Sequence, residues 1–161
     1  MRELHLCRNV EAPLPMLWRS WDRFGDIDRF HPKVTASRLT RGSARTGLGA
    51  ERWCLFGAGG PCLKERIIAY QYEEYMVIHV VDGRGLLQDA RITLDFVALS
   101  TGQSRLAFRL ELSGRKGMLF RVLSSYALKR LRMEFDGLLS ANAGYVERCA
   151  RGAAQGVSEP A

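Results

Sequence analysis

The order of secondary-structure signals is the feature that most constrains how this chain can fold. An unbroken series of strand-like segments runs from Val34 to Leu112, and a single long amphipathic helix follows. The connections inside that series, such as 82–85 and 100–103, are short and contain glycine. Such turns join antiparallel strands, whereas parallel strands need much longer crossovers. The order therefore predicts an antiparallel sheet packed against one C-terminal helix.

Seven segments carry the residue pattern of strands. They are 3–10, 34–40, 49–56, 62–70, 75–81, 86–99 and 104–112. Two short helices are expected between the first two strands. Pro13 and Pro15 stand where a helix can begin, and a second turn capped by Asp26 has to end before Pro32. The predicted fold class is therefore α+β.

The final helix, expected over 117–148, has one apolar face. Leu131, Phe135 and Leu138 recur at helical spacing on it, while Lys129 and Arg132 fall on the other side. We expect the apolar face to pack on the sheet. A curved sheet and a straight helix cannot touch along their whole length, so this packing leaves an internal apolar space. Spaces of this kind usually hold ligands.

The length of 161 residues matches one domain of ordinary size. We expect that domain to span 1–149 and the small, polar residues of 150–161 to form a disordered tail. No apolar run approaches the roughly 18 residues that cross a bilayer, so no transmembrane segment is expected. An acid and a histidine interrupt the first seven residues, where a secretory signal would be apolar. These features favour a cytoplasmic protein.

The formal net charge is +7, with 24 basic and 17 acidic residues. Phosphate binding by lysine and arginine dominates nucleic-acid affinity, so a nucleic-acid partner has to be considered. The basic residues are scattered, however, and their nearest cluster lacks the aromatic platform of single-strand binders. That cluster is Arg121, Lys129, Arg130 and Arg132 on the final helix. The pattern argues against nucleic acid and favours a solvated basic face.

Cysteine and histidine spacing gives no metal or cofactor signal. The cysteines are Cys7, Cys54, Cys62 and Cys149, and the histidines are His5, His31 and His79. No C-x-x-C pair and no H-E-x-x-H pattern occurs. A G-x-S-x-G elbow and a phosphate-binding glycine loop are also missing. We therefore predict no metal, no cofactor and buried free thiols.

The segment 62–70 offers a candidate polar group for the cavity. Side chains alternate between the faces of a strand, so Leu63, Glu65, Ile67 and Ala69 share one face. The other face carries Lys64, Arg66, Ile68 and Tyr70. If the two basic residues face water, Glu65 faces the cavity. A carboxylate among apolar neighbours is either a functional acid or a paired one.

The hairpin before this segment suggests a partner for that carboxylate. If the chain turns at Ala58-Gly59, Arg52 lies opposite Glu65 and Glu51 lies opposite Arg66. Two complementary cross-strand pairs result. A structural role and a functional role for Glu65 both stay open at this point.

Several short motifs, taken in order, resemble one known family. They are Ala12-Pro13, Trp18, Phe30 and Pro32, then Gly49-Ala50-Glu51-Arg52, Glu65-Arg66-Ile67 and the long final helix. Residues 2–148 thereby resemble the polyketide cyclase/dehydrase branch of the START-like (Bet v 1-like, SRPBCC) superfamily. The resemblance implies a helix-grip fold, in which a seven-stranded antiparallel sheet wraps around the C-terminal helix and encloses a hydrophobic cavity. Members bind lipids, hormones, quinones or polyketides, and only some are catalysts.

The resemblance also implies candidate site residues. In the plant abscisic acid receptor branch, a glutamate and a lysine at matching places face the ligand, and these look like Glu65 and Lys33 here. Together with strand and helix faces, this gives an expected ligand-binding set. Its members are Lys33, Arg52, Glu65, Ile67, His79, Leu131, Phe135 and Leu138.

Three functions follow as hypotheses. The first is binding of a small hydrophobic or aromatic molecule, such as a lipid, a quinone or a polyketide-like compound. The second is a polyketide aromatase/cyclase or dehydratase, in which Glu65, with His79 or Lys33, moves protons. The third is a basic interaction module for an acidic partner. Homodimerisation is left open.

Overall fold

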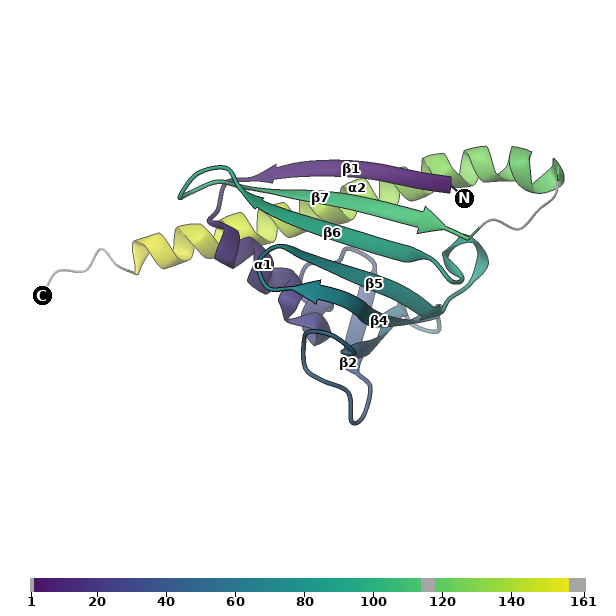
Figure 1. Cartoon of the computed structure of the whole chain (residues 1–161), viewed down its shortest axis with the longest axis horizontal. Helices are drawn as coiled ribbons and strands as arrows, with labels where there is room; N and C mark the ends of the chain where they lie inside the picture. Colours follow the sequence, from purple (N-terminus) through teal and green to yellow (C-terminus); the bar gives the residue numbers. More distant parts are fainter. Residues whose placement is uncertain (1, 114–117, 157–161) are drawn as a thin grey trace, which may run out of the picture.

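The computed structural model describes residues 2–113 and 118–156, and it describes side chains outside 118–124. Seven strands form one antiparallel sheet with the order β1-β7-β6-β5-β4-β3-β2 (Figure 1). The strands are β1 (Arg2–Val10), β2 (Val34–Leu39), β3 (Glu51–Phe56), β4 (Cys62–Gln71), β5 (Tyr75–Asp82), β6 (Arg91–Ala98) and β7 (Ser104–Leu112). The helices are α1 (Leu14–Asp22), η1 (Phe24–Arg29), η2 (Gly85–Leu87) and α2 (Met118–Gln155). The predicted α+β fold with a long C-terminal helix is confirmed, and the arrangement is consistent with a helix grip.

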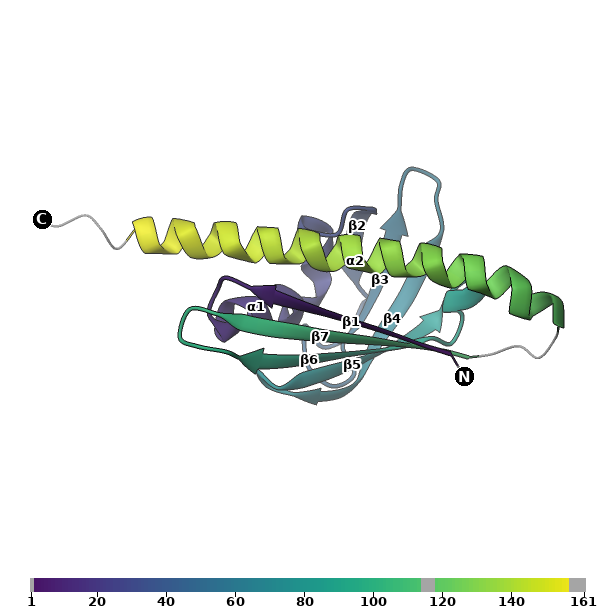
Figure 2. The ribbon, with the colours of Figure 1, turned by 90° about the horizontal axis from the view of Figure 1, so that it is seen from above.

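The long helix α2 lies on one side of the sheet, alongside β1 and β7 (Figure 2). An ion pair fixes it to β1, because Arg8 Nη2 lies 2.7 Å from Asp136 Oδ1. Helix α2 therefore covers one face of the sheet and leaves the other face open. None of the described helices is both long enough and apolar enough to cross a membrane.

Helix α1 fills one end of the space between the sheet and α2. Pro15 stands in its first turn, where no intrahelical N–H bond is lost, and Leu17, Trp18 and Trp21 are buried. The Trp18 ring lies 4.9 Å from the Phe96 ring of β6, and Trp21 Nε1 donates to Asn142 Oδ1 of α2 at 3.0 Å. Trp18 thus packs α1 on the sheet, and Trp21 joins α1 to α2.

The alternation of side chains is clearest in β7. Its burial pattern switches at every residue from Ser104 to Leu112, so one side of the strand meets α2 and the other meets solvent. Strand β5, on the other side of β6, behaves likewise, with Met76, Ile78 and Val80 buried. These inward side chains form the core on the side of the sheet that α2 covers.

Several predicted strand ends differ from the structure by one residue, and three predicted boundaries differ by more. The strand predicted over 86–99 begins at Arg91, because Gly85–Leu87 form a 3₁₀ turn and Asp89 takes a positive φ of 59°. The strand predicted over 49–56 begins at Glu51, because Gly49 has a φ of +83°. The tail predicted over 150–161 is helical as far as Gln155. The predicted helix start at Gly117 lies outside the described residues.

Strand β4 contains a bulge that reverses its alternation. The pairing with β5 shifts between Ile67 and Ala69, so one residue has no direct partner. Tyr70 consequently points inward, where its ring lies 5.3 Å from the Trp18 ring and its hydroxyl donates to Asp22 Oδ1 at 2.8 Å. The prediction that Tyr70 shares the outer face with Lys64 was wrong for this reason.

The thiol prediction holds only in part. All four cysteines are free, but only Cys54 is buried. The others, Cys7, Cys62 and Cys149, are exposed because they lie on an outer strand face, at a strand start and on the open side of α2.

Candidate ligand cavity

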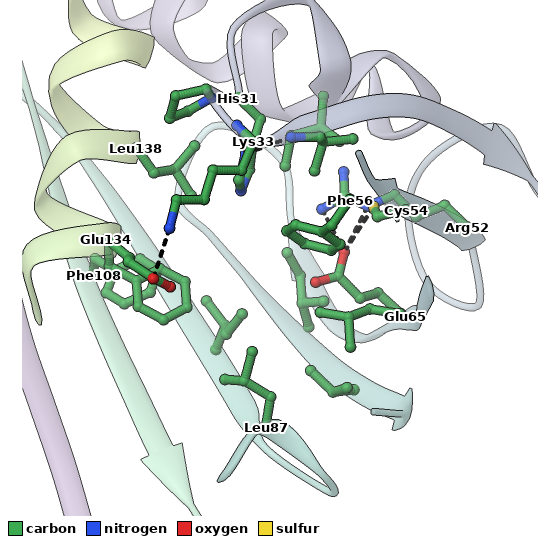
Figure 3. Close-up of a pocket in the computed structure, with 18 of the residues that line it drawn as sticks. His31, Lys33, Arg52, Cys54, Phe56, Glu65, Leu87, Phe108, Glu134 and Leu138 are labelled. Atoms are coloured by element: carbon green, nitrogen blue, oxygen red, sulfur yellow. Dashed lines mark hydrogen bonds and ion pairs between the residues drawn. The ribbon is translucent and has the colours of Figure 1, made fainter. Parts of the chain in front are cut away.

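A cavity of about 100 Å³ lies between the inner face of the sheet and α2 (Figure 3). Its lining comes from the segment entering β2, from strands β3 to β7, from the α1–η1 region, from η2 and from α2. The apolar lining residues include Ile78, Val80, Leu87, Ile92, Phe108, Leu131, Phe135 and Leu138. Its charged or titratable lining residues are His31, Lys33, Arg52, Cys54, Glu65 and Glu134.

One side of the cavity is closed by a buried ion pair. The Arg52 Nε and Nη2 atoms both lie 2.7 Å from Glu65 Oε2. The Arg52 and Glu65 side chains are 3% and 10% exposed. Burial alone would lower the pKa of Arg52, but the charge of Glu65 raises it above its ordinary value. The guanidinium therefore stays charged and neutralises the carboxylate.

The remaining contacts of Arg52 use its third nitrogen and its flat face. Nη1 donates to the Phe24 carbonyl oxygen at 2.7 Å, and the guanidinium carbon lies 4.0 Å from the centre of the Phe24 ring. Cys54 Sγ lies 3.6 Å from Glu65 Oε2. Burial raises the pKa of the Cys54 thiol to about 12, so it is not a thiolate nucleophile at neutral pH.

His31 lies at the turn into β2 and its ring lines the cavity. The backbone N–H groups of Lys33 and Val34 donate to His31 Nδ1 at 3.0 and 3.1 Å. Burial is the main cause that lowers the pKa of His31 to about 4, so the ring is neutral at pH 7. Because Nδ1 accepts hydrogen bonds, the single ring proton belongs on Nε2.

Lys33 and Glu134 form an ion pair opposite Glu65, as Figure 3 shows. Lys33 Nζ lies 2.6 Å from Glu134 Oε1, and their side chains are 51% and 34% exposed. Burial alone would raise the pKa of Glu134, but the hydrogen bond from Lys33 opposes this, and the pKa lies below its ordinary value. This pair joins the start of β2 to α2 where the cavity reaches the surface.

Six residues of the predicted ligand-binding set line the cavity. They are Lys33, Arg52, Glu65, Leu131, Phe135 and Leu138. The predicted register is confirmed too, since Arg52 pairs with Glu65 and Glu51 pairs with Arg66. Whether these residues bind a ligand stays a prediction.

Two residues of the set lie elsewhere. Ile67 is fully buried in the core and does not line the cavity. His79 lies on the outer face, because its neighbours Ile78 and Val80 point inward and alternation turns it away. There its Nε2 lies 2.6 Å from Asp89 Oδ1. The candidate catalytic role of His79 at the cavity was therefore wrong.

His31 and Glu134 are cavity residues that the sequence analysis missed. His31 lies in a turn, where no periodic pattern shows which way a side chain points. Glu134 lies beside the predicted apolar face of α2 and three residues after Leu131, so helical spacing could have identified it as a neighbour.

The outer face of the same hairpin carries a second set of charges. Glu51 accepts from Arg66 Nε at 2.8 Å and pairs with Lys64 at 2.7 Å. The hydrogen bond from Lys64 is the main cause that lowers the pKa of Glu51 to about 2. This set points away from the cavity and stabilises the hairpin.

The remaining predictions concern metals and the basic helix face. Within the residues that the structure describes, no group of three or more metal-ligating side chains occurs. Lys129 and Arg132 are exposed on α2, and Arg130 Nε lies 3.4 Å from Glu134 Oε1. The Arg121 side chain lies outside the described residues. An acidic partner for this face stays a prediction.

Comparison with known proteins supports the fold. No protein-family model matches the chain, and no curated protein does. A protein from Thermus thermophilus has a similar structure, with a TM-score of 0.74 at 15% identity over 92% of this chain and 99% of that one. An uncharacterised protein from Bacillus thuringiensis gives 0.73 at 12% identity over 90% and 98%. One from Thermobifida fusca gives 0.69 at 27% identity over 92% and 95%. Their descriptions state no activity or ligand, so the similarity concerns the fold.

Proposed function

We propose that this protein binds a small, mostly apolar ring compound in the cavity between the sheet and α2, as helix-grip proteins of the START-like superfamily do. The observation that supports it is the cavity itself. Its lining is mostly apolar, with a few polar groups held in fixed positions by Arg52, the β2 turn and α2. This combination is typical of small-molecule sites.

The size of the cavity narrows the ligand class. Its volume of about 100 Å³ is well below the roughly 300–1,000 Å³ of drug-sized ligand pockets. An apolar cavity of about 150 Å³ is known to hold benzene. A single ring therefore fits with small side-chain shifts, whereas a lipid chain would require α2 or η2 to move. The proposal favours an aromatic compound over a lipid.

A titration followed by methyl NMR tests this function. We would add toluene, phenol, 1-naphthol and decanoate separately to the full chain. Ring compounds should shift the methyl signals of Ile78, Val80 and Ile92 in a saturable way. The buried methyls of Leu4 and Val10, which do not line the cavity, serve as internal controls. No saturable shift with any compound would refute the proposal.

A second candidate function, acid–base catalysis, is favoured by one observation. His31 and Glu65 line the same cavity, so His31 supplies the imidazole that the cyclase or dehydratase hypothesis assigned to His79. A neutral imidazole and a carboxylate can pass a proton through a bound substrate. Turnover of a polyketide surrogate that is lost in His31→Gln and kept in His79→Gln would support catalysis. Turnover that survives Glu65→Gln would remove Glu65 from that role.

A further inference from the structure

We propose that the ligand is a neutral ring compound carrying a hydroxyl group, and that this hydroxyl bridges His31 Nε2 and Glu65 Oε1. The inference rests on the proposed function, because it assumes that the cavity binds a ring compound. It adds the chemical class of the ligand and the two residues that select it.

Most polar groups of the cavity already have protein partners. Each of the three nitrogens of Arg52 contacts a protein oxygen, from Glu65 or from the Phe24 carbonyl group. Lys33 and Glu134 neutralise each other at 2.6 Å. Trp21 Nε1 donates to Asn142 of α2. None of these groups has an obvious need for a ligand.

Two cavity-lining atoms have spare hydrogen-bonding capacity. His31 Nε2 carries the ring proton, since Nδ1 accepts from Lys33 and Val34, and it forms no hydrogen bond with a described residue. Glu65 receives all of its hydrogen bonds from described residues at Oε2, which leaves Oε1 as an acceptor. The first atom is a donor and the second is an acceptor.

A hydroxyl group matches this pair, because one oxygen can both donate and accept. It would donate to Glu65 Oε1 and accept from His31 Nε2–H. His31 and Glu65 line the same cavity of about 100 Å³, so a small ligand held there lies between the turn into β2 and strand β4. A methyl group in the same place would leave both atoms unpaired, which costs binding free energy.

The charges of the cavity argue against an anionic ligand. The Glu65 carboxylate repels an anion, and the neutral His31 ring offers no positive charge. The Arg52 cation is already neutralised. A ligand carboxylate would have to separate Lys33 from Glu134 to find a counter-ion. A neutral hydroxyl needs no such rearrangement.

The test compares three rings of similar size, which are phenol, toluene and benzoate. Calorimetric or NMR titration of the full chain should give phenol the highest affinity, at least about tenfold above toluene, with benzoate the weakest. In His31→Phe the advantage of phenol over toluene should fall several-fold, while toluene itself still binds. His79→Phe, on the outer face, should keep the wild-type ratio. A purely structural role of His31 would change both affinities together.

A second measurement uses the wild-type protein, so it does not depend on whether a variant at position 31 folds. The chain has three histidines, so their ring signals can be separated by NMR. Phenol should shift the His31 Nε2 signal and toluene should leave it nearly unchanged. Equal affinity for toluene and phenol would overturn the inference while the proposed function stands. Preferential binding of benzoate would overturn it also. Binding of none of the three rings would overturn both.

Discussion

Arg52 and Glu65 face each other across β3 and β4, and two guanidinium nitrogens lie 2.7 Å from the same carboxylate oxygen. One residue earlier and one residue later, Glu51 and Arg66 form the equivalent pair on the opposite face of the sheet. The hairpin thus carries one buried ion pair and one that is partly exposed. Alternation alone produces this division, and it gives the cavity a charged but neutralised wall.

The buried pair predicts a strong coupling between its two members. Glu65→Leu or Arg52→Met alone should lower the free energy of unfolding by about 3–5 kcal/mol, because each leaves an unpaired buried charge. The double variant should recover most of that loss, since it buries no charge. Urea unfolding measures the free energy of unfolding of the two single variants and of the double variant. Losses that simply add in the double variant would show that the two charges are not coupled.

The outer pair provides the matched control. Arg66→Met should cost less than about 1 kcal/mol, because the Arg66 side chain is 49% exposed and Lys64 still neutralises Glu51. A loss as large as that of Arg52→Met would mean that burial does not set the strength of these pairs.

The pKa of His31 predicts a pH-dependent stability. It is lowered from 6.5 to about 4, so between these values the unfolded chain binds a proton that the folded protein does not. The free energy of unfolding should therefore decrease as the pH falls from 6.5 to about 4. His31→Phe should remove this part of the dependence, and His79→Gln should keep it. Glu51, with a pKa of about 2, contributes only at lower pH, from 4.5 downward. Identical pH profiles for wild type and His31→Phe would contradict the assignment.

The Lys33–Glu134 pair should control access of anions. Glu134→Gln frees Lys33 and should raise the affinity for benzoate by up to about fivefold, because an exposed ion pair is worth at most about 1 kcal/mol. Arg130→Gln, which leaves Lys33 and Glu134 paired, should have no such effect. Calorimetry measures both. An unchanged benzoate affinity in Glu134→Gln would show that Lys33 does not face the ligand.

The inward turn of Tyr70 also has a measurable consequence. Tyr70→Phe should cost about 1 kcal/mol of unfolding free energy, because the lost hydroxyl donates a hydrogen bond to Asp22. Thr46 donates to the same carboxylate oxygen, so Asp22 would keep one partner. Tyr72→Phe, at a residue that is 62% exposed, should change stability much less. Equal costs for the two variants would argue against the bulge as described.

Much of the fold could be predicted because its signals are local and periodic. Short glycine turns predicted the hairpins, and the turn at Ala58-Gly59 predicted the register that pairs Arg52 with Glu65. Strand alternation, with Lys64 and Arg66 facing water, predicted the inward direction of Glu65. The length of α2 was underestimated, since small polar residues after Ala150 gave no helical periodicity, although the helix continues to Gln155.

Three side-chain directions were less predictable, because periodicity alone does not set them. The bulge after Ile67 turns Tyr70 inward, and no residue pattern in β4 predicts this bulge. The direction of His79 depends on which face of β5 is buried, and the pairing of Ile78 with the buried Ile67 of β4 sets that face. His31 lies in a turn, where hydrogen bonds to Lys33 and Val34 set its direction. Such contacts depend on distant parts of the chain.

A cavity-filling variant gives the most direct test of ligand binding between the sheet and α2. Ile92 lines the cavity, and Val97 lies on the outer face of the same strand with 52% exposure. Phenol and toluene would be titrated into wild type, Ile92→Phe and Val97→Phe, with folding verified by unfolding curves. We expect saturable binding to wild type and to Val97→Phe and at least a tenfold loss, about 1.4 kcal/mol, in Ile92→Phe. Binding that Ile92→Phe leaves unchanged, or no binding to wild type, would contradict a ligand site in this cavity.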